Sequence, residues 1–511
     1  MCGFIYVDSN KLNKNDINLA LGKISFRGPD FQKTERYEGQ YFLSHCRLSI
    51  LDLNHRSNQP MISKSKRYSI IFNGEIYNYL ELAQSLNLEL TTTSDTEVIV
   101  EGYEKIGIKI FELLDGMFSL VIHDHKESSW IATRDLFGIK PLYIYQKNNE
   151  TIISSETKAI SELKNLTISS ESINEWEIFR SPIPGKSFFK EIDEVLPGQI
   201  VYSNGQKVFH SFLENQEKKF QQDEFENLLQ KSIRKHCLSD VENVSLISGG
   251  LDSSIVCFET NFENYYSVGL IENNEFSDVE ETSRRLNKYI NLCTIDESKL
   301  KQNWISLTKL KGEPLSVPNE SLIYEVCTKF NPNEKVLLTG EGADELLFGY
   351  DRIFRWGLNE SFNLNKFLNL YSYSNSKPTE RFIDFIQNIK KNKTNIEFLE
   401  DFFIKFHLPV LLRRMDFASM AAGKEARVPF VDKSLFNYLY RSNPKVKINK
   451  NYSKIPLRNY AKKRNLDFLL KRKKIGFSAK INFNNNNLDE YSNFRNIVIS
   501  NLGWDEYAEK K

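Results

Sequence analysis

The chain begins Met1-Cys2-Gly3, so removal of the initiator methionine would leave a cysteine with a free α-amine. The thiol of such a residue is a nucleophile that carries its own base. An α-amine titrates near pH 7.7 to 8.0, so about a tenth of it is neutral at pH 7 and can accept the thiol proton. A lone Met-Cys start is more often an accident of translation, so the catalytic interpretation depends on the residues downstream.

Four downstream residues could complete a site around this thiol. Asn73 and Gly74 follow a strand-like run at 68–72 and predict a polar turn, which could offer an amide side chain and a backbone N–H to an oxyanion. Arg47 ends another run and could bind a carboxylate through two hydrogen bonds. Asp95 is first of all a helix N-cap candidate, but it could also bind an ammonium group. Together these groups describe a site for an amino acid with a cleavable side-chain amide, which is glutamine.

A second constellation follows a short β-prone run at 243–247. The segment SGGLDSS extends from Ser248 to Ser254 and precedes a helix-like stretch. A strand, a glycine loop and a helix form a phosphate-binding geometry, because backbone N–H groups and the helix N-terminus both face the anion. The lysine of the GxxxxGK[ST] loop is missing. Asp252 supplies a carboxylate for Mg²⁺, which usually lies between carboxylates and phosphate oxygens.

Further strand-like runs at 265–269, 292–295 and 335–339 alternate with helix-length segments. This alternation predicts a parallel α/β sheet with ligands at the carboxyl ends of its strands. The last run leads into TGEGADE at 339–345, which places three carboxylates within five residues. Such a cluster is costly unless a metal or a cationic ligand joins it, although a solvated acidic turn is the alternative interpretation.

The first of these constellations resembles the N-terminal-cysteine glutamine amidotransferases and, within them, the glutamine-hydrolysing asparagine synthetases. The matching segments are MCGFIYVD, RGPD, RLSILD, FNGEIYN, TSDTEV and RDLFGIKPLY, in order across the first third of the chain. SGGLDSS resembles the pyrophosphate loop of enzymes that split ATP into AMP and pyrophosphate. The resemblance implies an α+β N-terminal nucleophile domain, an αββα sandwich, followed by an α/β parallel-sheet domain with a helical C-terminal part.

The resemblance also implies roles for the residues of the first site. Cys2 would attack the glutamine amide, Asn73 and Gly74 would stabilise the oxyanion, and Arg47 would bind the glutamine carboxylate. Glu75 and Asp95 would orient the α-amine end.

In the second site the resemblance assigns ATP and Mg²⁺. Asp252 and Asp344 would hold the metal, Glu341 would serve the acyl-adenylate step, and Lys454 in YSKIPLR would steady the phosphate and acyl groups. Glu345 and Asp416 fall at the acceptor site. The nucleotide would contact Ile247, Ser248, Gly249, Gly250, Asp252, Ser253, Ser254, Val268, Thr339 and Gly340. The basic run KRKK at 471–474 is more simply a solvated cationic face than a contact of ATP.

Three positions depart from the family pattern. Phe26 stands where a histidine usually precedes RGPD, and Phe417 stands where a basic or polar residue is more usual. The loop 315–321, LSVPNES, replaces the usual acceptor-loop sequence. The family default acceptor is aspartate, which would give asparagine. Relatives with the same mechanism amidate other carboxylates, such as sugar acids of surface polysaccharides, so the acceptor stays open at this point.

Composition is compatible with this enzyme class. The 511 residues allow a glutaminase domain at 1–205, a polar linker at 206–224 and a synthetase domain at 225–511. The 68 basic and 67 acidic residues nearly cancel, which gives no electrostatic argument for a nucleic-acid partner and disfavours a tRNA-modifying enzyme. A stand-alone hydrolase would not need SGGLDSS, and a catalytically dead scaffold would not need the competent side chains at both sites.

The sequence also leads to expectations about the location and the partners of the protein. No apolar run has membrane-spanning length, and the N-terminal segment lacks a hydrophobic signal core. The six cysteines form no CxxC pair and Cys2 must be a free thiol, so we expect a cytoplasmic enzyme of small-molecule substrates with no membrane partner. A homodimer is compatible with the resemblance. The asparagine- and lysine-rich segments 361–393 and 482–487 are compositional bias to which we assign no chemistry.

Overall fold

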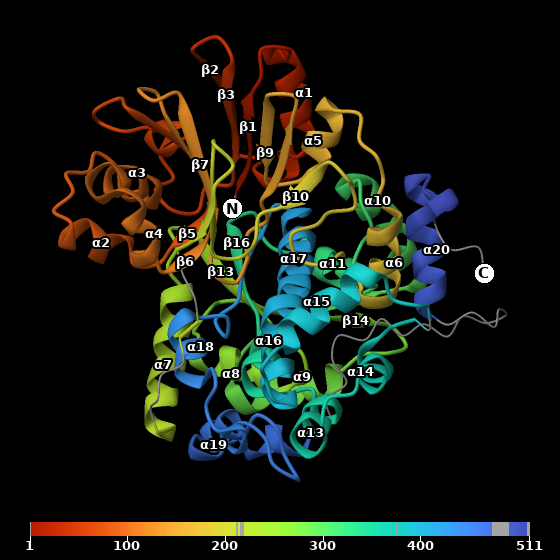
Figure 1. Ribbon diagram of the computed structural model, residues 1–511. Coiled ribbons are helices and arrows are strands. Elements are labelled where there is room, and N and C mark those ends of the chain that lie inside the picture. The colour runs from red at the N-terminus through yellow and green to blue at the C-terminus, as the bar shows by residue number, and fades with distance from the viewer. Residues whose placement is uncertain (1, 211–212, 215–218, 375, 473–489, 508–511) are drawn as a thin grey trace.

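The computed structural model describes residues 2–210, 213–214, 219–374, 376–472 and 490–507 (Figure 1). Its N-terminal half contains two six-stranded antiparallel sheets. The first has the order β10-β8-β9-β1-β3-β2 and is formed by β1 (Cys2–Asp8), β2 (Phe31–Tyr37), β3 (Tyr41–Arg47), β8 (Tyr143–Lys147), β9 (Glu150–Ser154) and β10 (Ile192–Glu194). The second has the order β12-β11-β7-β6-β5-β4 and is formed by β4 (Met61–Ile62), β5 (Tyr68–Ile76), β6 (Gly116–Asp124), β7 (Ser129–Arg134), β11 (Gln199–Tyr202) and β12 (Lys207–Phe209).

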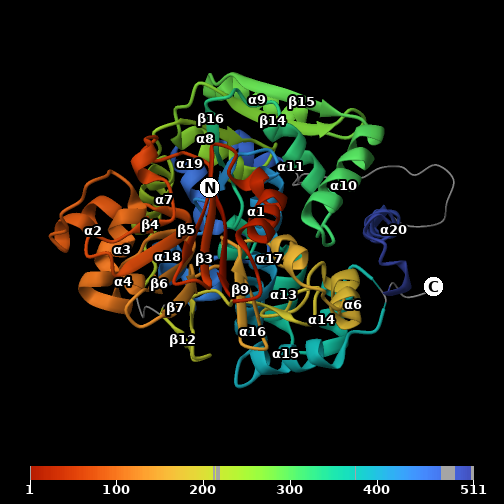
Figure 2. The ribbon, with the colours of Figure 1, turned by 90° about the horizontal axis from the view of Figure 1, so that it is seen from above.

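The two sheets pack face to face with helices on the outside. Alternating residues of β1 and β6, such as Phe4, Tyr6 and Val121, fill the layer between the sheets. The outer face of one sheet carries α1 (Lys14–Lys23) and α5 (Thr157–Leu163), and that of the other carries α2 (Tyr79–Ser85), α3 (Asp95–Ile106) and α4 (Ile110–Leu113). Helices α2 to α4 lie together on one flank in both views (Figures 1 and 2). The predicted αββα sandwich is confirmed.

One local prediction is wrong. The expected polar turn at Asn73 to Glu75 is a continuation of β5, which extends to Ile76. The reason is that β6 pairs along the whole segment, with Asn73 opposite Ser119 and Glu75 opposite Met117. Because side chains alternate along a strand, Asn73 and Glu75 lie on the same face of the sheet.

The second half is built on a five-stranded parallel sheet of order β15-β14-β13-β16-β17. Its strands are β13 (Glu242–Leu246), β14 (Tyr265–Leu270), β15 (Ile290–Ile295), β16 (Glu334–Leu338) and β17 (Glu425–Arg427). Four of them were predicted from their apolar runs, within two residues at either end. The connecting helices are α7 (Gln222–His236), α8 (Leu251–Glu259), α9 (Phe276–Leu286), α10 (Glu297–Lys311), α11 (Glu320–Cys327) and α12 (Ala343–Leu347).

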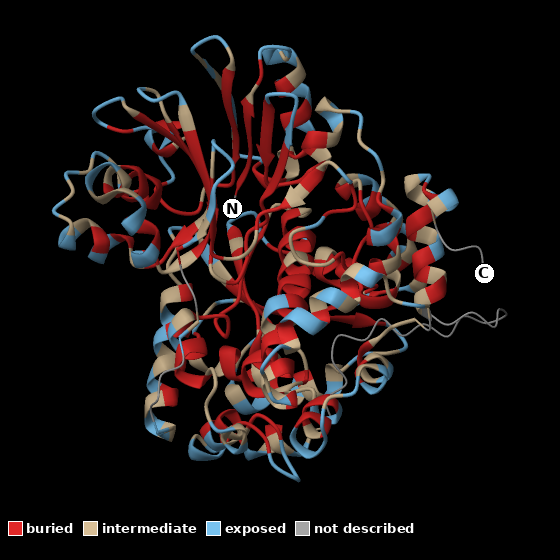
Figure 3. Cartoon of the chain, in the orientation of Figure 1, coloured by how far each residue is buried: buried red, intermediate tan, exposed pale blue. Residues whose placement is uncertain are grey.

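A helical region completes this half and confirms the predicted helical C-terminal part. It comprises α13 (Asp351–Asn359), α14 (Leu364–Tyr371), α15 (Glu380–Lys390), α16 (Asn395–Phe402), a π-helix at Phe403–His407, α17 (Leu408–Met420), α18 (Lys433–Leu439), α19 (Ile455–Lys463) and α20 (Glu490–Leu502). Helix α17 is buried on nearly all sides (Figure 3). The biased segment 361–393 forms α14 and α15, whose Phe367, Tyr371 and Phe382 join an aromatic core. The segment 482–487 lies outside the described residues.

The two halves share their hydrophobic core. One cluster joins Leu48 and Ile139 of the first half to Leu229, Val428 and Val431 of the second. The segment 206–224 between them contains β12, which pairs with β11, and the first residues of α7. Within the described ranges, no helix combines the length and the apolar character that crossing a bilayer requires.

Candidate functional site

A pocket of about 30 Å³ lies where β1, β3 and β5 meet the start of α3. It brings together five side chains or backbone groups that the sequence predicted for a glutamine site. They are Cys2, Arg47, Gly74, Glu75 and Asp95.

Asn73 is tied directly to the nucleophile. The Cys2 backbone N–H donates to Asn73 Oδ1 at 3.1 Å, so the amide is held with a fixed orientation. Asn73 Nδ2 is buried and has no hydrogen-bond partner among the described residues. A donor of this kind next to a nucleophile can stabilise a developing oxyanion. Burial raises the pKa of the Cys2 thiol, so the thiolate needs a base.

Arg47 forms part of the pocket wall as the last residue of β3. Its guanidinium donates to the carbonyl oxygens of Leu51, Asp52 and Asn54 and to Asn58 Oδ1. These four hydrogen bonds fix the plane of the guanidinium at the edge of the pocket.

Two buried carboxylates face the same pocket. Ser94, and not Asp95, caps helix α3, because Ser94 accepts from the N–H of Thr96. Asp95 is instead free to turn inward, where it accepts from the N–H of Ile76 at 3.0 Å, and burial raises its pKa to about 6. Glu75 Oε2 forms an ion pair with Arg427 at 3.1 Å, while Glu75 Oε1 is buried without a hydrogen-bond partner among the described residues.

The second site is at the carboxyl ends of β13 and β16. After β13 the chain passes through Ser248 to Gly250 into α8, as the phosphate-loop interpretation requires. Ser253 Oγ accepts from the N–H of Ser248 at 3.0 Å and closes the loop. Of the predicted nucleotide residues, Val268 lies on the neighbouring strand β14, and Thr339 and Gly340 follow β16. A Cβ at Gly340 would lie 2.7 Å from the N of Ser253, so only glycine lets the two loops touch.

Lys454 forms ion pairs with both of the predicted metal ligands. Its Nζ lies 2.5 Å from Asp252 Oδ2 and 2.7 Å from Asp344 Oδ1, although the three residues come from three different segments. Burial alone would lower the pKa of Lys454, but Asp252 and Asp344 together raise it above its ordinary value. Lys454 holds this position with a left-handed backbone, at φ 54°, which is unusual for a lysine and typical of functional sites.

The remaining acidic residues of TGEGADE have distinct partners. Glu341 pairs with Arg414 of α17, and Arg414 Nη1 also donates to Asn319 Oδ1, at 3.4 Å, in the loop 315–321. Glu345 accepts from the hydroxyl of Tyr350 at 2.6 Å, and burial together with Asp344 and Glu341 raises its pKa to about 8.

Asp416 does not join this group. Its two carboxylate oxygens pair with Arg27 at 2.9 Å and with Lys140 at 3.3 Å, and both cations belong to the first half of the chain. Both oxygens are engaged at the interface between the halves, and the acceptor contact of Asp416 stays a prediction. Phe417 beside it packs edge-on against Phe26, with ring centroids 5.9 Å apart. Two of the three departures from the family pattern thus contact each other.

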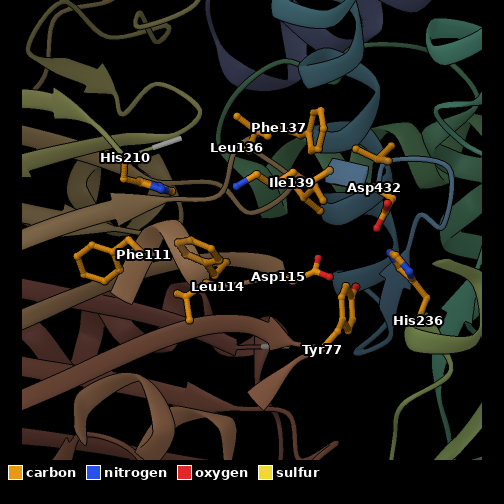
Figure 4. A pocket seen from close by; sticks show the side chains of 14 residues that line it. Tyr77, Phe111, Leu114, Asp115, Leu136, Phe137, Ile139, His210, His236 and Asp432 are labelled. Atoms are coloured by element: carbon orange, nitrogen blue, oxygen red, sulfur yellow. The ribbon is translucent and has the colours of Figure 1, made fainter. Parts of the chain in front are cut away.

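Residues from both halves also enclose a small cavity of about 30 Å³ (Figure 4). Tyr77 and Asp115 from the first half approach His236 and Asp432 from the second. The ammonium of Lys235 pairs with both Asp115 and Asp432. The cavity can hold a water-sized molecule.

Comparison with known proteins identifies the family of this chain. A model described as a glutamine amidotransferase domain matches residues 1–213, and a model described as asparagine synthase matches residues 224–501. The chain belongs to the asparagine synthase family. It is a glutamine-dependent amide ligase, and its family is ATP-dependent.

Three relatives from this family illustrate the degree of similarity. Asparagine synthetase [glutamine-hydrolyzing] 3 of Bacillus subtilis is 27% identical over 93% of this chain and 86% of its own. Asparagine synthetase [glutamine-hydrolyzing] 1 of the same organism is 28% identical over 98% and 90%. Putative asparagine synthetase [glutamine-hydrolyzing] 2 of Methanocaldococcus jannaschii is 30% identical over 68% and 76%.

Several residues at the two sites of this family member were not found from the sequence. Arg414 and Arg427 lie on either side of Asp416 and Phe417, but an arginine in a helix or strand carries no local signal of its partner. Arg472 belongs to the basic run that the sequence predicts to be a solvated face, yet it donates to the Gly249 carbonyl at 3.1 Å and pairs with Glu281. The remaining lysines of that run, 473 and 474, lie outside the described residues. Gly349 is the clearest omission, because a Cβ there would collide with Asp344 and Lys454.

Proposed function

We propose that the chain is a glutamine-dependent asparagine synthetase with two active sites. Glutamine would be hydrolysed at Cys2, and the ammonia would pass to a site where ATP activates the side-chain carboxylate of aspartate. The observation that carries this proposal is the joint presence of a Cys2–Asn73 glutamine pocket and the Asp252–Lys454–Asp344 cluster within one continuous core. The domain limits at 1–205 and 225–511, with the linker 206–224, are part of the proposal.

In the first site, the thiol of Cys2 would attack the amide carbon and its α-amine, after removal of Met1, would take the thiol proton. Asn73 Nδ2 and the Gly74 N–H would donate to the oxyanion of the tetrahedral intermediate. Arg47 would bind the α-carboxylate, and Glu75 with Asp95 would bind the α-ammonium. Collapse of the intermediate would release ammonia and leave a thioester, which water then hydrolyses to glutamate.

In the second site, Asp252 and Asp344 would hold Mg²⁺. The donor set fits this ion, because Mg²⁺ in ATP sites usually takes one or two carboxylates and completes its shell with phosphate oxygens and water. Asp252 Oδ1 is buried and has no hydrogen-bond partner among the described residues, which is the state expected of a ligand oxygen. When bound, Mg²⁺ would neutralise phosphate charge.

Lys454 would hold the α-phosphate and the acyl oxygen while pyrophosphate leaves, because its ammonium already lies between the two carboxylates. The loop from Ser248 to Ser254 would hold the pyrophosphate with its N–H and hydroxyl groups, with Ile247 leading into it. Glu341 would accept a proton from the attacking ammonia after the acyl-adenylate has formed, and AMP would then leave.

Aspartate is the acceptor that the second site supports best. An amino-acid acceptor offers a carboxylate and an ammonium besides the reacting group. Arg414, held between Glu341 and Asn319, could bind the carboxylate, and Glu345 in its ionised form could bind the ammonium. Phe417 packs against Phe26, so its departure from the family pattern bears on the interface and not on the acceptor.

A sugar acid is the second candidate, and the loop 315–321 favours it. Such an acceptor would offer hydroxyl groups, for which Asn319 and Ser316 of that loop are suitable partners.

The experiment that separates the two acceptors is an AMP-release assay with purified enzyme, ATP, Mg²⁺ and glutamine against a panel of carboxylic acids. We expect AMP and pyrophosphate with aspartate and little with uronic acids or glutamate. The matched control is Asp252→Asn, which should release no AMP with any acid while it still hydrolyses glutamine. AMP release with a sugar acid but not with aspartate would contradict the asparagine synthetase proposal and leave the amidotransferase mechanism standing.

A further inference from the structure

Glu75 lines the glutamine pocket of the first half, but its charged partner belongs to the second half. Arg427, the last residue of β17, pairs with Glu75 Oε2 at 3.1 Å. The guanidinium is fully buried, and the Glu75 side chain is 3% exposed. A buried carboxylate at this contact depends on its partner far more than a surface pair does.

The rest of Arg427 is fixed by the second half. Its Nε donates to Glu425 at 2.6 Å, and its Nη1 donates to the carbonyl oxygens of His236 and Leu238. Its backbone carbonyl accepts from the N–H of Thr339 at 3.0 Å. One residue therefore connects the strand that enters TGEGADE with the wall of the glutamine pocket.

Glu75 has one oxygen engaged and one available. Oε2 faces Arg427, whereas Oε1 is buried and lacks a hydrogen-bond partner among the described residues. Burial raises the pKa of Glu75 and the Asp95 and Glu425 carboxylates raise it further, whereas Arg427 opposes them. Without Arg427, the carboxyl group would lose its ion pair and, with it, its fixed orientation.

We infer that Arg427 is a positioning residue of the glutamine site, supplied by the synthetase half, which holds Glu75 so that its second oxygen can accept the α-ammonium of glutamine. This inference rests on the proposed glutamine contact of Glu75. It means that the glutamine pocket is complete only when β17 is docked against it. The same residue of β17 accepts from the N–H of Thr339 at the start of TGEGADE, so one strand contacts both proposed sites.

The test uses the full-length enzyme and compares Arg427→Met, Arg427→Lys, Glu75→Gln and the double variant Glu75→Gln/Arg427→Met. For Arg427→Met we expect the KM for glutamine to rise about 30-fold or more, with kcat for hydrolysis within about threefold of the wild type. Arg427→Lys keeps a cation, so its KM for glutamine should lie between that of the wild type and that of Arg427→Met. If Arg427 acts through Glu75, the double variant should be no worse than Glu75→Gln alone.

The matched control is Arg413→Met. Arg413 of α17 also forms a buried ion pair across the interface, with Glu194 at 2.8 Å, but neither residue lines the glutamine pocket. Its loss should leave the KM for glutamine unchanged. Release of AMP with added ammonium chloride, measured in every preparation, reports whether the second site is intact.

The outcomes are distinguishable. A KM for glutamine within twofold of wild type in Arg427→Met, or effects of Glu75→Gln and Arg427→Met that multiply in the double variant, would overturn the inference. If Arg427→Met does not fold, Arg427→Gln, which also removes the cation, is judged by the same KM criterion. Failure of the wild-type enzyme to hydrolyse glutamine would instead refute the proposed function.

Discussion

At the scale of single residues, both sites retain buried polar atoms that the protein itself does not satisfy. Among the described residues, Asn73 Nδ2, Glu75 Oε1 and Asp252 Oδ1 are buried without a hydrogen-bond partner. Each such atom costs about 1 to 3 kcal/mol in the folded state. The cost is offset when a ligand supplies the missing partner, and this is the role that we propose for an oxyanion, an ammonium and a metal ion at these three atoms.

The oxyanion assignment predicts the effect of Asn73→Ala. Loss of one preorganised donor should lower kcat for glutamine hydrolysis about a hundredfold or more, which is roughly 3 kcal/mol, with little change in glutamine affinity. Steady-state kinetics of the full-length enzyme measure both quantities. A raised KM with an unchanged kcat would make Asn73 a binding residue and contradict the assignment.

The ammonium assignment predicts a pH dependence. Burial raises the pKa of Asp95 to about 6, so Asp95 is ionised above this pH and protonated below it. Since an ammonium binds the ionised form, the Kd for glutamine should be lowest above pH 7 and should rise up to about tenfold per unit below pH 6. Calorimetry on a Cys2→Ser variant between pH 5 and 8 checks this without turnover, and Asp95→Asn in the same background should bind more weakly and lose the part of the pH dependence that is centred near pH 6. A constant Kd across this range in Cys2→Ser would exclude Asp95 as an ammonium ligand.

At the scale of elements, local apolar runs were sufficient to predict β13, β14, β15 and β16. Strand β14 is buried throughout and β13 and β16 are buried at their carboxyl ends, whereas the edge strand β15 exposes Leu292 and Thr294. The same reasoning failed at Asn73 to Glu75. Polar and glycine residues there predict a turn, but β6 supplies pairing partners along the whole segment. A polar site residue inside a strand is specified by its neighbours in space, which a local window does not contain.

Side-chain contacts between distant parts of the chain could not be predicted from local sequence for a related reason. Glu75 with Arg427, and Phe26 with Phe417, are far apart in the chain. The residue types of the proposed catalytic groups, such as Cys2 and Lys454, are informative because their chemistry is specific. An arginine or a phenylalanine suits many surroundings, so its partner becomes known only from the fold.

The close approach of three loops predicts that Gly349→Ala abolishes AMP formation. A methyl group there would collide with Asp344 Oδ1 and Lys454 Cε and so displace the cluster that holds Asp252. Glutamine hydrolysis should persist, because the collision involves only the second site. Gly22→Ala is the matched control, since a Cβ at Gly22 of α1 meets nothing within 4 Å. Normal AMP release by Gly349→Ala would show that the cluster does not require this spacing.

At the scale of the whole molecule, the interface between the halves is built like a protein interior. Apolar residues of both halves share one core, and Asp416 lies between Arg27 and Lys140 inside it. Relative motion of domains is the default only where their contact is small or polar. We therefore expect the two sites to keep a fixed relation during turnover, so that ammonia released at Cys2 is used within the same molecule.

The measurement that tests this account most directly follows the glutamine amide nitrogen. The full-length enzyme is given amide-¹⁵N glutamine, ATP, Mg²⁺ and aspartate. Unlabelled ammonium is added in excess over the ammonia that glutamine hydrolysis releases, but below the concentration that supports synthesis without glutamine. The account predicts AMP and pyrophosphate in equal amounts and ¹⁵N in the amide of the product, and Cys2→Ala should lose this labelling while it keeps synthesis from concentrated ammonium. Formation of ADP and phosphate, or a wild-type product without ¹⁵N, would contradict it.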